Sequence, residues 1–298
     1  MLRTAHRLLC LQCRLIANSL PGAVAAHSAT PLHDLRVAIR RLCAVLRAFR
    51  KPLAGTAAAR LAEPFAQLNA ELGPLRDADV WLAYLRSRKI RRQLKRAPSW
   101  PAYLAACEAA RQQTLADQRR LLGRRAVKSL LKRAAHACRV ELPRMIRARH
   151  HEPIRPFAAD QLKRLFDFIA EHKDVKPGAS PDDLHTLRKR CRRGRYCAEF
   201  FAPVLGPMSD DLARRFKRLA DPLGRIHDVD VALERIAQSR VPPPRQLLKI
   251  LRRRRTASWK KFRKAWTALR RRKFIKRVAR NLSADGTGSI QGLSPTGS

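Results

Sequence analysis

The sequence predicts an all-α protein built as two pseudo-symmetric four-helix bundles from an internal duplication. Three observations lead to this fold class. Ala, Leu and Arg dominate the 298 residues, and runs of β-branched residues are missing. Apolar residues recur at helical spacing between Pro and Gly breaks, which is typical of packed amphipathic helices. Related segments also return in the same order about 150 residues apart, as in a duplicated unit.

The helices are expected between the Pro and Gly residues that punctuate the chain. Gly123 is expected to bend or split the longest of them. Residues 283–298 are rich in turn formers, so we expect a disordered tail there. The expected helices cover residues 2–20, 32–50, 56–72, 77–96, 101–141, 158–173, 181–202, 209–221, 228–239 and 245–280.

The duplication rests on two pairs of segments. HDLRVAIRR begins at His33 and returns as HTLRKRCRR at His185, which is 152 residues later (185 − 33). LGPLRDADV begins at Leu72 and returns as LGRIHDVDV at Leu223, which is 151 residues later (223 − 72). Because the order and the spacing agree in both halves, chance is a poor explanation of the match.

The chain is expected to form a single domain over residues 2–280. Its N-terminal bundle covers about residues 2–150 and its C-terminal bundle about residues 155–280, with the boundary near His150–Pro153. Each half holds about four principal helices, which is enough for one helical bundle.

The charge of the chain indicates its class of partner. Lys and Arg together number 65 and Asp and Glu 23, which gives a net charge of +42. Self-repulsion at that charge destabilises a compact fold unless a polyanion or counterions offset it. The expected partner is therefore nucleic acid, anionic lipid or a phosphate polymer.

The repeated segments separate apolar from cationic residues on a helical wheel. In the first copy, Arg36 and Arg40 fall within about 60° of His33, and Leu35 lies on the opposite side. The second copy shows the same separation around His185. We expect one face of each helix to be buried and the other to bind anions. The candidate contacts are His33, Arg36, Arg40, Arg41, Arg47, His185, Arg188, Lys189, Arg192, Arg193 and Arg195.

An ordinary solvated face is the alternative interpretation of these two rows. Two observations favour anion binding instead. The rows contain almost no carboxylates, whereas ordinary surfaces mix both signs of charge. The histidine and the arginines also recur at the same offsets. Arg binds phosphate through two parallel hydrogen bonds, and His becomes cationic when a nearby anion raises its pKa.

Metal binding and catalysis are not expected. The arginines beside His33 and His185 would repel a cation, and the C-x-x-C of Cys10 and Cys13 lacks a second ligand pair at zinc-finger spacing. No nucleotide-binding loop or hydrolase motif is present. We therefore expect no catalytic residue, no cofactor and no metal. The seven cysteines are expected to be reduced thiols in the cytoplasm.

Two D-x-D pairs could in principle hold Mg²⁺. Each pair follows a Gly that is expected to form a turn and to begin a helix, where Asp caps backbone N–H groups and pairs with Arg. We therefore expect a structural role for these carboxylates, which are Asp77, Asp79, Asp228 and Asp230.

The first helix is expected to be amphipathic rather than a signal sequence. Gln12 and Arg14 interrupt its apolar run. No run of about eighteen apolar residues is present, so no membrane span is expected.

The chain resembles the CHAD domain, the "conserved histidine α-helical domain". The family pattern H-x-L-R-V-x-x-R-R followed by L-G-x-L-R-D-x-D-V is similar to HDLRVAIRR and LGPLRDADV, and the second copies fit with changes. Cys43 stands where the second copy has Arg195, and His227 where the first copy has Arg76. The resemblance covers about residues 2–280 and implies two bundles with basic surfaces that bind inorganic polyphosphate, often on polyphosphate granules.

The resemblance implies a non-enzymatic scaffold or targeting protein for polyphosphate in the cytoplasm. The family is often joined to a CYTH triphosphatase-type domain, which these residues lack, so a separate CYTH-type phosphatase is a candidate partner. The alternative function is sequence-nonspecific nucleic-acid binding. Aromatic residues make up only 6% of the chain and fall on expected core stripes, which disfavours stacking on single-stranded bases. Duplex DNA remains open, because backbone contacts need no aromatic residues.

Overall fold

The computed structural model describes residues 1–148, 153–172, 175 and 179–283, and within them every regular element is a helix. The predicted all-α class is thus confirmed. The expected bundle boundary near His150 and most of the expected tail lie outside the described residues. The first half contains α1 (Leu2–Ala25), α2 (Ala29–Ala48), a 3₁₀ turn (Ala58–Leu61), α3 (Ala62–Glu71), α4 (Gly73–Arg86), α5 (Arg88–Leu94), α6 (Trp100–Gly123), α7 (Arg125–His136), the π-helical turn η2 (Ala137–Glu141) and α8 (Leu142–Ala148).

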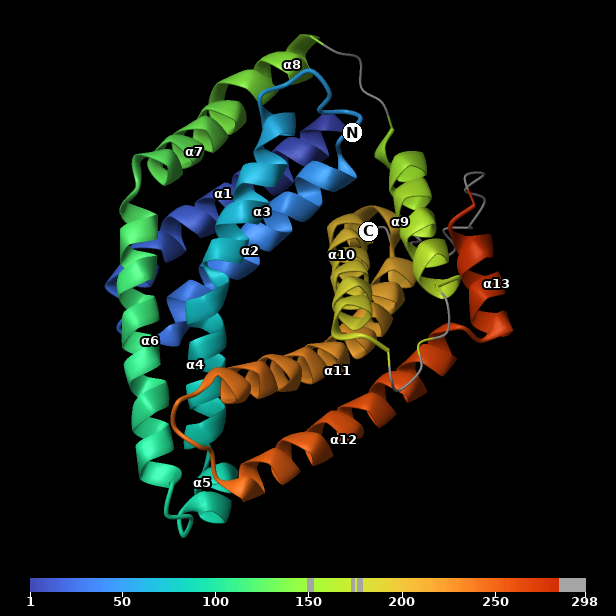
Figure 1. Cartoon of the computed structure of the whole chain (residues 1–298). Coiled ribbons are helices and arrows are strands. Elements are labelled where there is room, and N and C mark those ends of the chain that lie inside the picture. The colour runs from blue at the N-terminus through green and yellow to red at the C-terminus, as the bar shows by residue number, and fades with distance from the viewer. Residues whose placement is uncertain (149–152, 173–174, 176–178, 284–298) are drawn as a thin grey trace, which may run out of the picture.

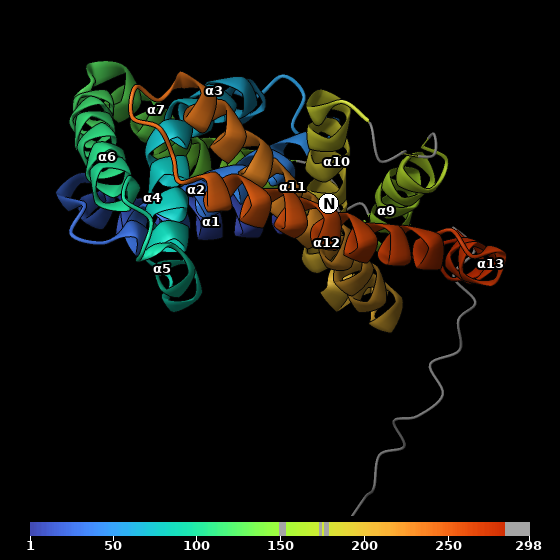
Figure 2. The same cartoon turned by 60° about the horizontal axis from the view of Figure 1, so that its bottom comes forward.

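The second half has fewer and longer helices. In Figure 1, α10 lies near the centre of the molecule, and α11 and α12 run side by side along its lower edge. Figure 2 shows α12 crossing the molecule toward α13. The helices of this half are α9 (Ile154–Ala170), α10 (Pro181–Leu205), α11 (Pro207–Gln238), α12 (Arg245–Leu269) and α13 (Arg272–Asn281).

The helix boundaries confirm one part of the sequence prediction and correct another. The predicted helix over residues 101–141 does split at Gly123, as expected, because α6 ends there. The prediction of separate helices over 209–221 and 228–239 is wrong, since α11 runs without interruption through Pro222. Pro222 is itself buried in the core, and α11 packs along both α10 and α12. This packing outweighs the backbone hydrogen bond that a proline removes from a helix interior.

Both halves of the chain contribute to one main hydrophobic core. The ring of Phe49, directly after α2, lies 5.2 Å from that of Phe157 in α9 and 5.8 Å from that of Phe201 in α10, between centroids. Phe49 and Phe201 are completely buried. The two halves therefore share a core, and α2 is held next to α10.

A second, smaller core forms where α4 and α5 meet α11 and α12, at the lower left of Figure 1. Trp81 and Ile90 come from the first half, and Val229 and Leu251 come from the second. The halves are thus joined by apolar packing at two places.

The first helix, α1, is long and apolar enough by length and composition to cross a membrane, with a hydropathy of 1.3 in its most apolar window. About a quarter of that window (28%) is buried inside the protein. Ala5, Leu9 and Ile16 are among its buried residues, and α1 packs extensively against α2. Although α1 packs against α2, most of its apolar window is not buried, so the absence of a membrane span stays a prediction.

Candidate anion-binding site

The two repeated segments occupy equivalent positions in α2 and α10. The helices begin at Ala29 and at Pro181, so His33 and His185 are each the fifth residue of their helix. The Oγ atom of Ser180 caps α10 by accepting a hydrogen bond from the backbone N–H of Asp183 at 3.1 Å. The helical repeat then places the arginines of each row one turn apart, on the face that carries the histidine.

The two rows meet in one group of guanidinium ions, which we call the arginine cluster: Arg36, Arg40, Arg188 and Arg192. Burial, followed by the charge of Arg40, lowers the pKa of Arg36 to about 10. Burial, followed by the charges of Arg188 and Arg40, lowers the pKa of Arg192 to about 9. Residues of α2 and α10 therefore repel each other electrostatically across the contact between the helices. Arg36 and Arg192 nevertheless remain protonated at neutral pH.

Several side-chain nitrogen atoms of the two rows are buried without a hydrogen-bond partner among the described residues. They include the Nε atoms of Arg36, Arg40 and Arg193 and the Nδ1 atom of His185. A buried donor that has lost its water and gained no acceptor costs free energy. Buried polar groups in native proteins normally have partners, so these atoms indicate a place for an acceptor-rich ligand.

Two glycines let arginines of the cluster approach the neighbouring helices closely. A Cβ atom added at Gly73 would lie 3.5 Å from Nη1 of Arg36, and one added at Gly224 would lie 3.4 Å from Nε of Arg188. The same Nη1 donates a hydrogen bond to the carbonyl oxygen of Asn69 at 2.7 Å. The glycine of each L-G segment therefore leaves room for the arginine of the corresponding H-x-L-R segment.

The D-x-D pairs divide into two kinds of carboxylate. Asp79 accepts a hydrogen bond from Nε of Arg111 at 2.6 Å, and Asp230 accepts one from Nε of Arg255 at 2.8 Å. The first bond joins α4 to α6, and the second joins α11 to α12. Neither Asp is at a helix start, so the predicted capping role is wrong, whereas the predicted pairing with Arg is confirmed.

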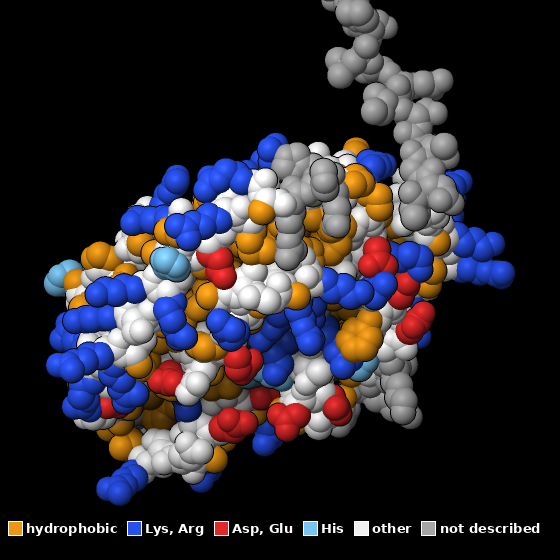
Figure 3. Space-filling model, turned by 90° about the horizontal axis from the view of Figure 1, so that it is seen from above, with side chains coloured by type: hydrophobic (Ala, Val, Ile, Leu, Met, Phe, Trp, Pro, Cys, Tyr) orange, Lys and Arg blue, Asp and Glu red, His pale blue; other side chains and the backbone are white. Residues whose placement is uncertain are grey.

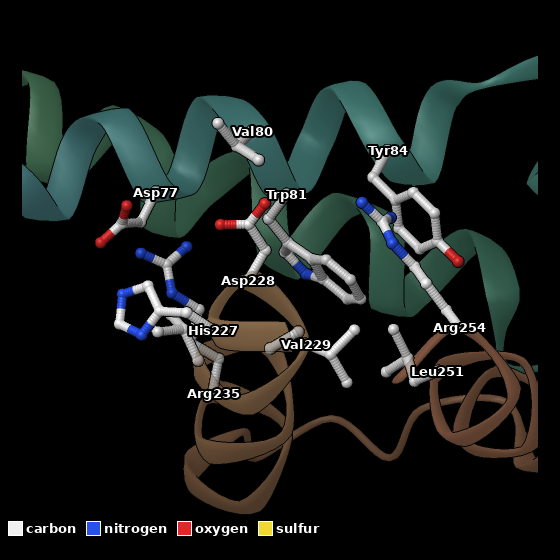
Figure 4. A pocket seen from close by; sticks show the side chains of 12 residues that line it. Asp77, Val80, Trp81, Tyr84, His227, Asp228, Val229, Arg235, Leu251 and Arg254 are labelled. Carbon is white, nitrogen blue, oxygen red and sulfur yellow. The ribbon is translucent and has the colours of Figure 1, made fainter. Parts of the chain in front are cut away.

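The other two carboxylates, Asp77 and Asp228, face the arginine cluster. Burial raises the pKa of each, and the nearby guanidinium ions, those of Arg36 and Arg188 first among them, act in the opposite direction. Figure 4 shows both carboxylates pointing into the same space as Arg235, in a pocket between α4, α11 and α12. Asp77 and Asp228 thus supply counter-charge, but two carboxylates do not balance four guanidinium ions.

The two histidines occupy equivalent positions of the repeat, with His33 exposed and His185 half-buried. The ring of His185 lies 4.7 Å from the ring of His227, between centroids. Burial, then His227, lowers the pKa of His185 to about 4, and burial, then Arg76, lowers the pKa of His33. Both histidines are therefore neutral at pH 7. Each of these histidines faces a residue from outside the two rows, Arg76 in the first half and His227 in the second. Arg76 and His227 occupy matching positions of the repeat.

The remaining predicted contacts lie outside the arginine cluster. Arg41 and Arg195 both form ion pairs with Glu199, the second through Nε at 2.6 Å. The Arg41 guanidinium also lies over the ring of Tyr196 at 5.2 Å. Arg41 therefore joins α2 to α10, whereas Arg195 pairs with Glu199 within α10. Arg47 and Lys189 are exposed, and Arg193 is half-buried.

Sequence reasoning missed one further arginine near the site. Arg235 in α11 donates a hydrogen bond through Nη2 to the carbonyl oxygen of Pro74 at 3.1 Å. It lies outside both repeated motifs, so no pattern in the sequence singles it out. Figure 3 shows how widely Lys and Arg side chains cover one face of the molecule, with fewer Asp and Glu side chains among them. No group of three or more His, Cys, Asp or Glu suited to a metal ion occurs among the described residues.

Comparison with known proteins assigns the fold to a family. The family model of the CHAD domain matches residues 8–237. No curated protein is significantly similar to the chain. The crystal structure of the CHAD domain from the plant Ricinus communis is similar to it, with a TM-score of 0.64 and 20% sequence identity over 95% of this chain and 91% of that one. Since the family model covers more than half of the chain, the protein belongs to the CHAD domain family.

Proposed function

We propose that this protein binds inorganic polyphosphate without hydrolysing it, and that the arginine cluster is the centre of the binding site. The observation that carries the proposal is the meeting of two repeated cationic rows, with buried and unpartnered Nε atoms on Arg36 and Arg40. On this proposal the protein is a cytoplasmic scaffold that coats or targets polyphosphate, for example at polyphosphate granules, and a separate CYTH-type phosphatase would do any hydrolysis.

The spacing of the cluster suits a polymer of phosphates. Arg36 and Arg40, like Arg188 and Arg192, are four residues apart, which is about 6 Å along a helix. Each guanidinium ion can bind one phosphate through two hydrogen bonds, so successive turns can engage successive phosphates. A chain of phosphates would also offset the burial and the mutual repulsion that lower the pKa values of Arg36 and Arg192.

The aromatic residues favour polyphosphate over single-stranded nucleic acid. Proteins that bind single strands stack bases on accessible aromatic rings. Here the largest rings are buried, among them Trp266, Phe201 and Phe216. The ring of Phe168 is 49% exposed, but the Arg190 guanidinium already covers it at 3.9 Å from the centroid.

The carboxylates of the site support a binding role over a hydrolytic one. Enzymes that hydrolyse phosphate anhydrides usually hold metal ions through carboxylates. Asp77 and Asp228 face guanidinium ions, which compete with a metal ion for their oxygens. Asp79 and Asp230 are engaged by Arg111 and Arg255.

Titration of fluorescently labelled long-chain polyphosphate at pH 6 and pH 8 tests this proposal. In the free protein burial lowers the pKa of His33 below its usual value and that of His185 to about 4, so His185 is neutral throughout this range. A bound polyanion raises these pKa values, so the complex takes up protons and affinity increases as the pH falls. We expect His33→Ala with His185→Ala to weaken binding about tenfold at pH 6 and at most about twofold at pH 8.

The charged groups around each histidine define the controls. His33 faces Arg76, Arg40, Asp34 and Arg36, none of which is a second histidine. His185 also faces His227, so His227→Ala is measured alone to separate its titration. Equal weakening of binding at both pH values would show that the histidines are not protonated in the complex with polyphosphate. The proposed function would be contradicted if binding did not saturate at either pH, or if the protein released orthophosphate from the polymer.

A further inference from the structure

Three thiols lie together where α1 contacts the π-helical turn η2. The Sγ atoms of Cys13 and Cys138 are 3.7 Å apart. Cys10, one helical turn before Cys13, also forms a side-chain hydrogen bond with Cys138. The sequence shows only the C-x-x-C of α1, and the fold brings the third thiol to it from 125 residues away. None of the three belongs to the anion-binding site.

The geometry is close to that of a disulfide. An S–S bond is about 2.05 Å long, so the two sulfur atoms would have to approach by less than about 2 Å. Cys138 lies in the π-helical turn Ala137–Glu141, a type of irregularity that often marks functional positions. The carbonyl oxygen of Cys138 is 2.8 Å from Nε2 of His6, which holds this turn against α1.

We propose that Cys13 and Cys138 form a site of reversible oxidation, at which a peroxide converts the two thiols to a disulfide that ties α1 to η2. The thiolate of Cys13 attacks one oxygen of hydrogen peroxide and the O–O bond breaks, which gives a sulfenic acid and hydroxide. The sulfur of Cys138 then attacks the sulfenic sulfur, the S–S bond forms, and the hydroxyl leaves as water with the proton of Cys138. The hydroxide takes up the proton that Cys13 released when it became a thiolate. The sulfur atoms thus lose two electrons in total, and the peroxide is reduced to two molecules of water.

The surroundings of the three thiols assign their roles. The hydrogen bond from Cys138 lowers the pKa of Cys13, and Cys13 is partly exposed, so this residue is the one that a peroxide meets as a thiolate. Cys138 is only 7% exposed and its pKa is raised, which makes it the second, resolving thiol. Burial raises the pKa of Cys10 to about 11, so Cys10 remains a thiol at neutral pH.

The disulfide would close a loop of more than one hundred residues between two elements of the first half. Such a bond stabilises the fold mainly by restricting the unfolded chain. Because neither α1 nor η2 contributes to the arginine cluster, oxidation should leave polyphosphate binding unchanged. The test of this inference is therefore independent of the proposed function.

Peptide mapping of the full chain after treatment with a small molar excess of hydrogen peroxide tests the proposal. We expect a peptide pair linked through Cys13 and Cys138 that dithiothreitol separates, and a rise of about 5 °C in the thermal midpoint. Cys13→Ser and Cys138→Ser should abolish both effects. Cys10→Ser, which removes a thiol of the same group, is the matched control and should keep both.

Two results would overturn the proposal, and both are measured on the protein without substitutions. One is a disulfide between Cys10 and Cys13. The other is oxidation of Cys13 to sulfinic acid while Cys138 can still be alkylated after unfolding, which would show that the two sulfur atoms do not meet.

Discussion

Replacing Arg36 and Arg188 together by glutamine should weaken binding of long-chain polyphosphate by about 100-fold, because hydrogen bonds that involve a charged group contribute about 1.5–3 kcal/mol each. One guanidinium comes from each half of the chain, and each lies close to the glycine of an L-G segment. Glutamine keeps a polar amide on a shorter side chain and removes the charge. Fluorescence titration with labelled polyphosphate at physiological salt measures the loss.

The matched control removes the same charge from an exposed place. Arg252 and Arg253 are exposed on α12, outside the arginine cluster. Their joint replacement by glutamine should weaken binding by less than about threefold, since exposed charges act mainly through screened, long-range attraction. If both double variants lose affinity equally, net charge alone governs binding and the cluster is not a site.

The second large effect concerns stability. Asp79→Asn should lower the free energy of unfolding by about 2 kcal/mol, because removal of one partner leaves the other charge of a buried pair uncompensated. The side chain of Asp79 is 4% exposed and that of Arg111 is 20% exposed, and their bond joins α4 to α6. Urea unfolding followed by circular dichroism measures the change.

A second ion pair between the same two helices supplies the control. Arg86 of α4 donates to Glu108 of α6 at 2.6 Å, with side chains that are 57% and 42% exposed. Glu108→Gln should change the free energy of unfolding by less than about 0.5 kcal/mol, because water screens exposed pairs. A loss as large as that of Asp79→Asn would show that burial does not set the strength of these contacts.

The sequence predicted the parts of this protein that depend on local pattern. Helical periodicity identified the all-α class, and the repeat identified equivalent helices that begin at Ala29 and Pro181. The wheel of HDLRVAIRR separated buried Leu35 from Arg36 and Arg40, and the structure has the same separation. Local pattern sufficed here because side-chain direction along a helix follows from its repeat alone.

The prediction was weaker where tertiary contacts decide. Separate helices were predicted over 209–221 and 228–239, but packing of α11 on both sides keeps one helix continuous. Arg41 and Arg195 were expected to bind a ligand, and Glu199, which neither repeated motif contains, engages both. The two rows meet in one cluster because the core around Phe49 holds α2 next to α10. This core joins residues about 150 positions apart, which local pattern does not reveal.

The central claim is that the arginine cluster is a site for polyphosphate, and competition binding tests it most directly. Labelled long-chain polyphosphate bound to the full chain at physiological salt is displaced by unlabelled polyphosphate, single-stranded RNA or duplex DNA at equal phosphate concentration. We predict that unlabelled polyphosphate displaces the label at a phosphate concentration at least about tenfold lower than either nucleic acid, a difference of about 1.4 kcal/mol. Equal or stronger displacement by RNA or duplex DNA would contradict the account and favour nonspecific nucleic-acid binding.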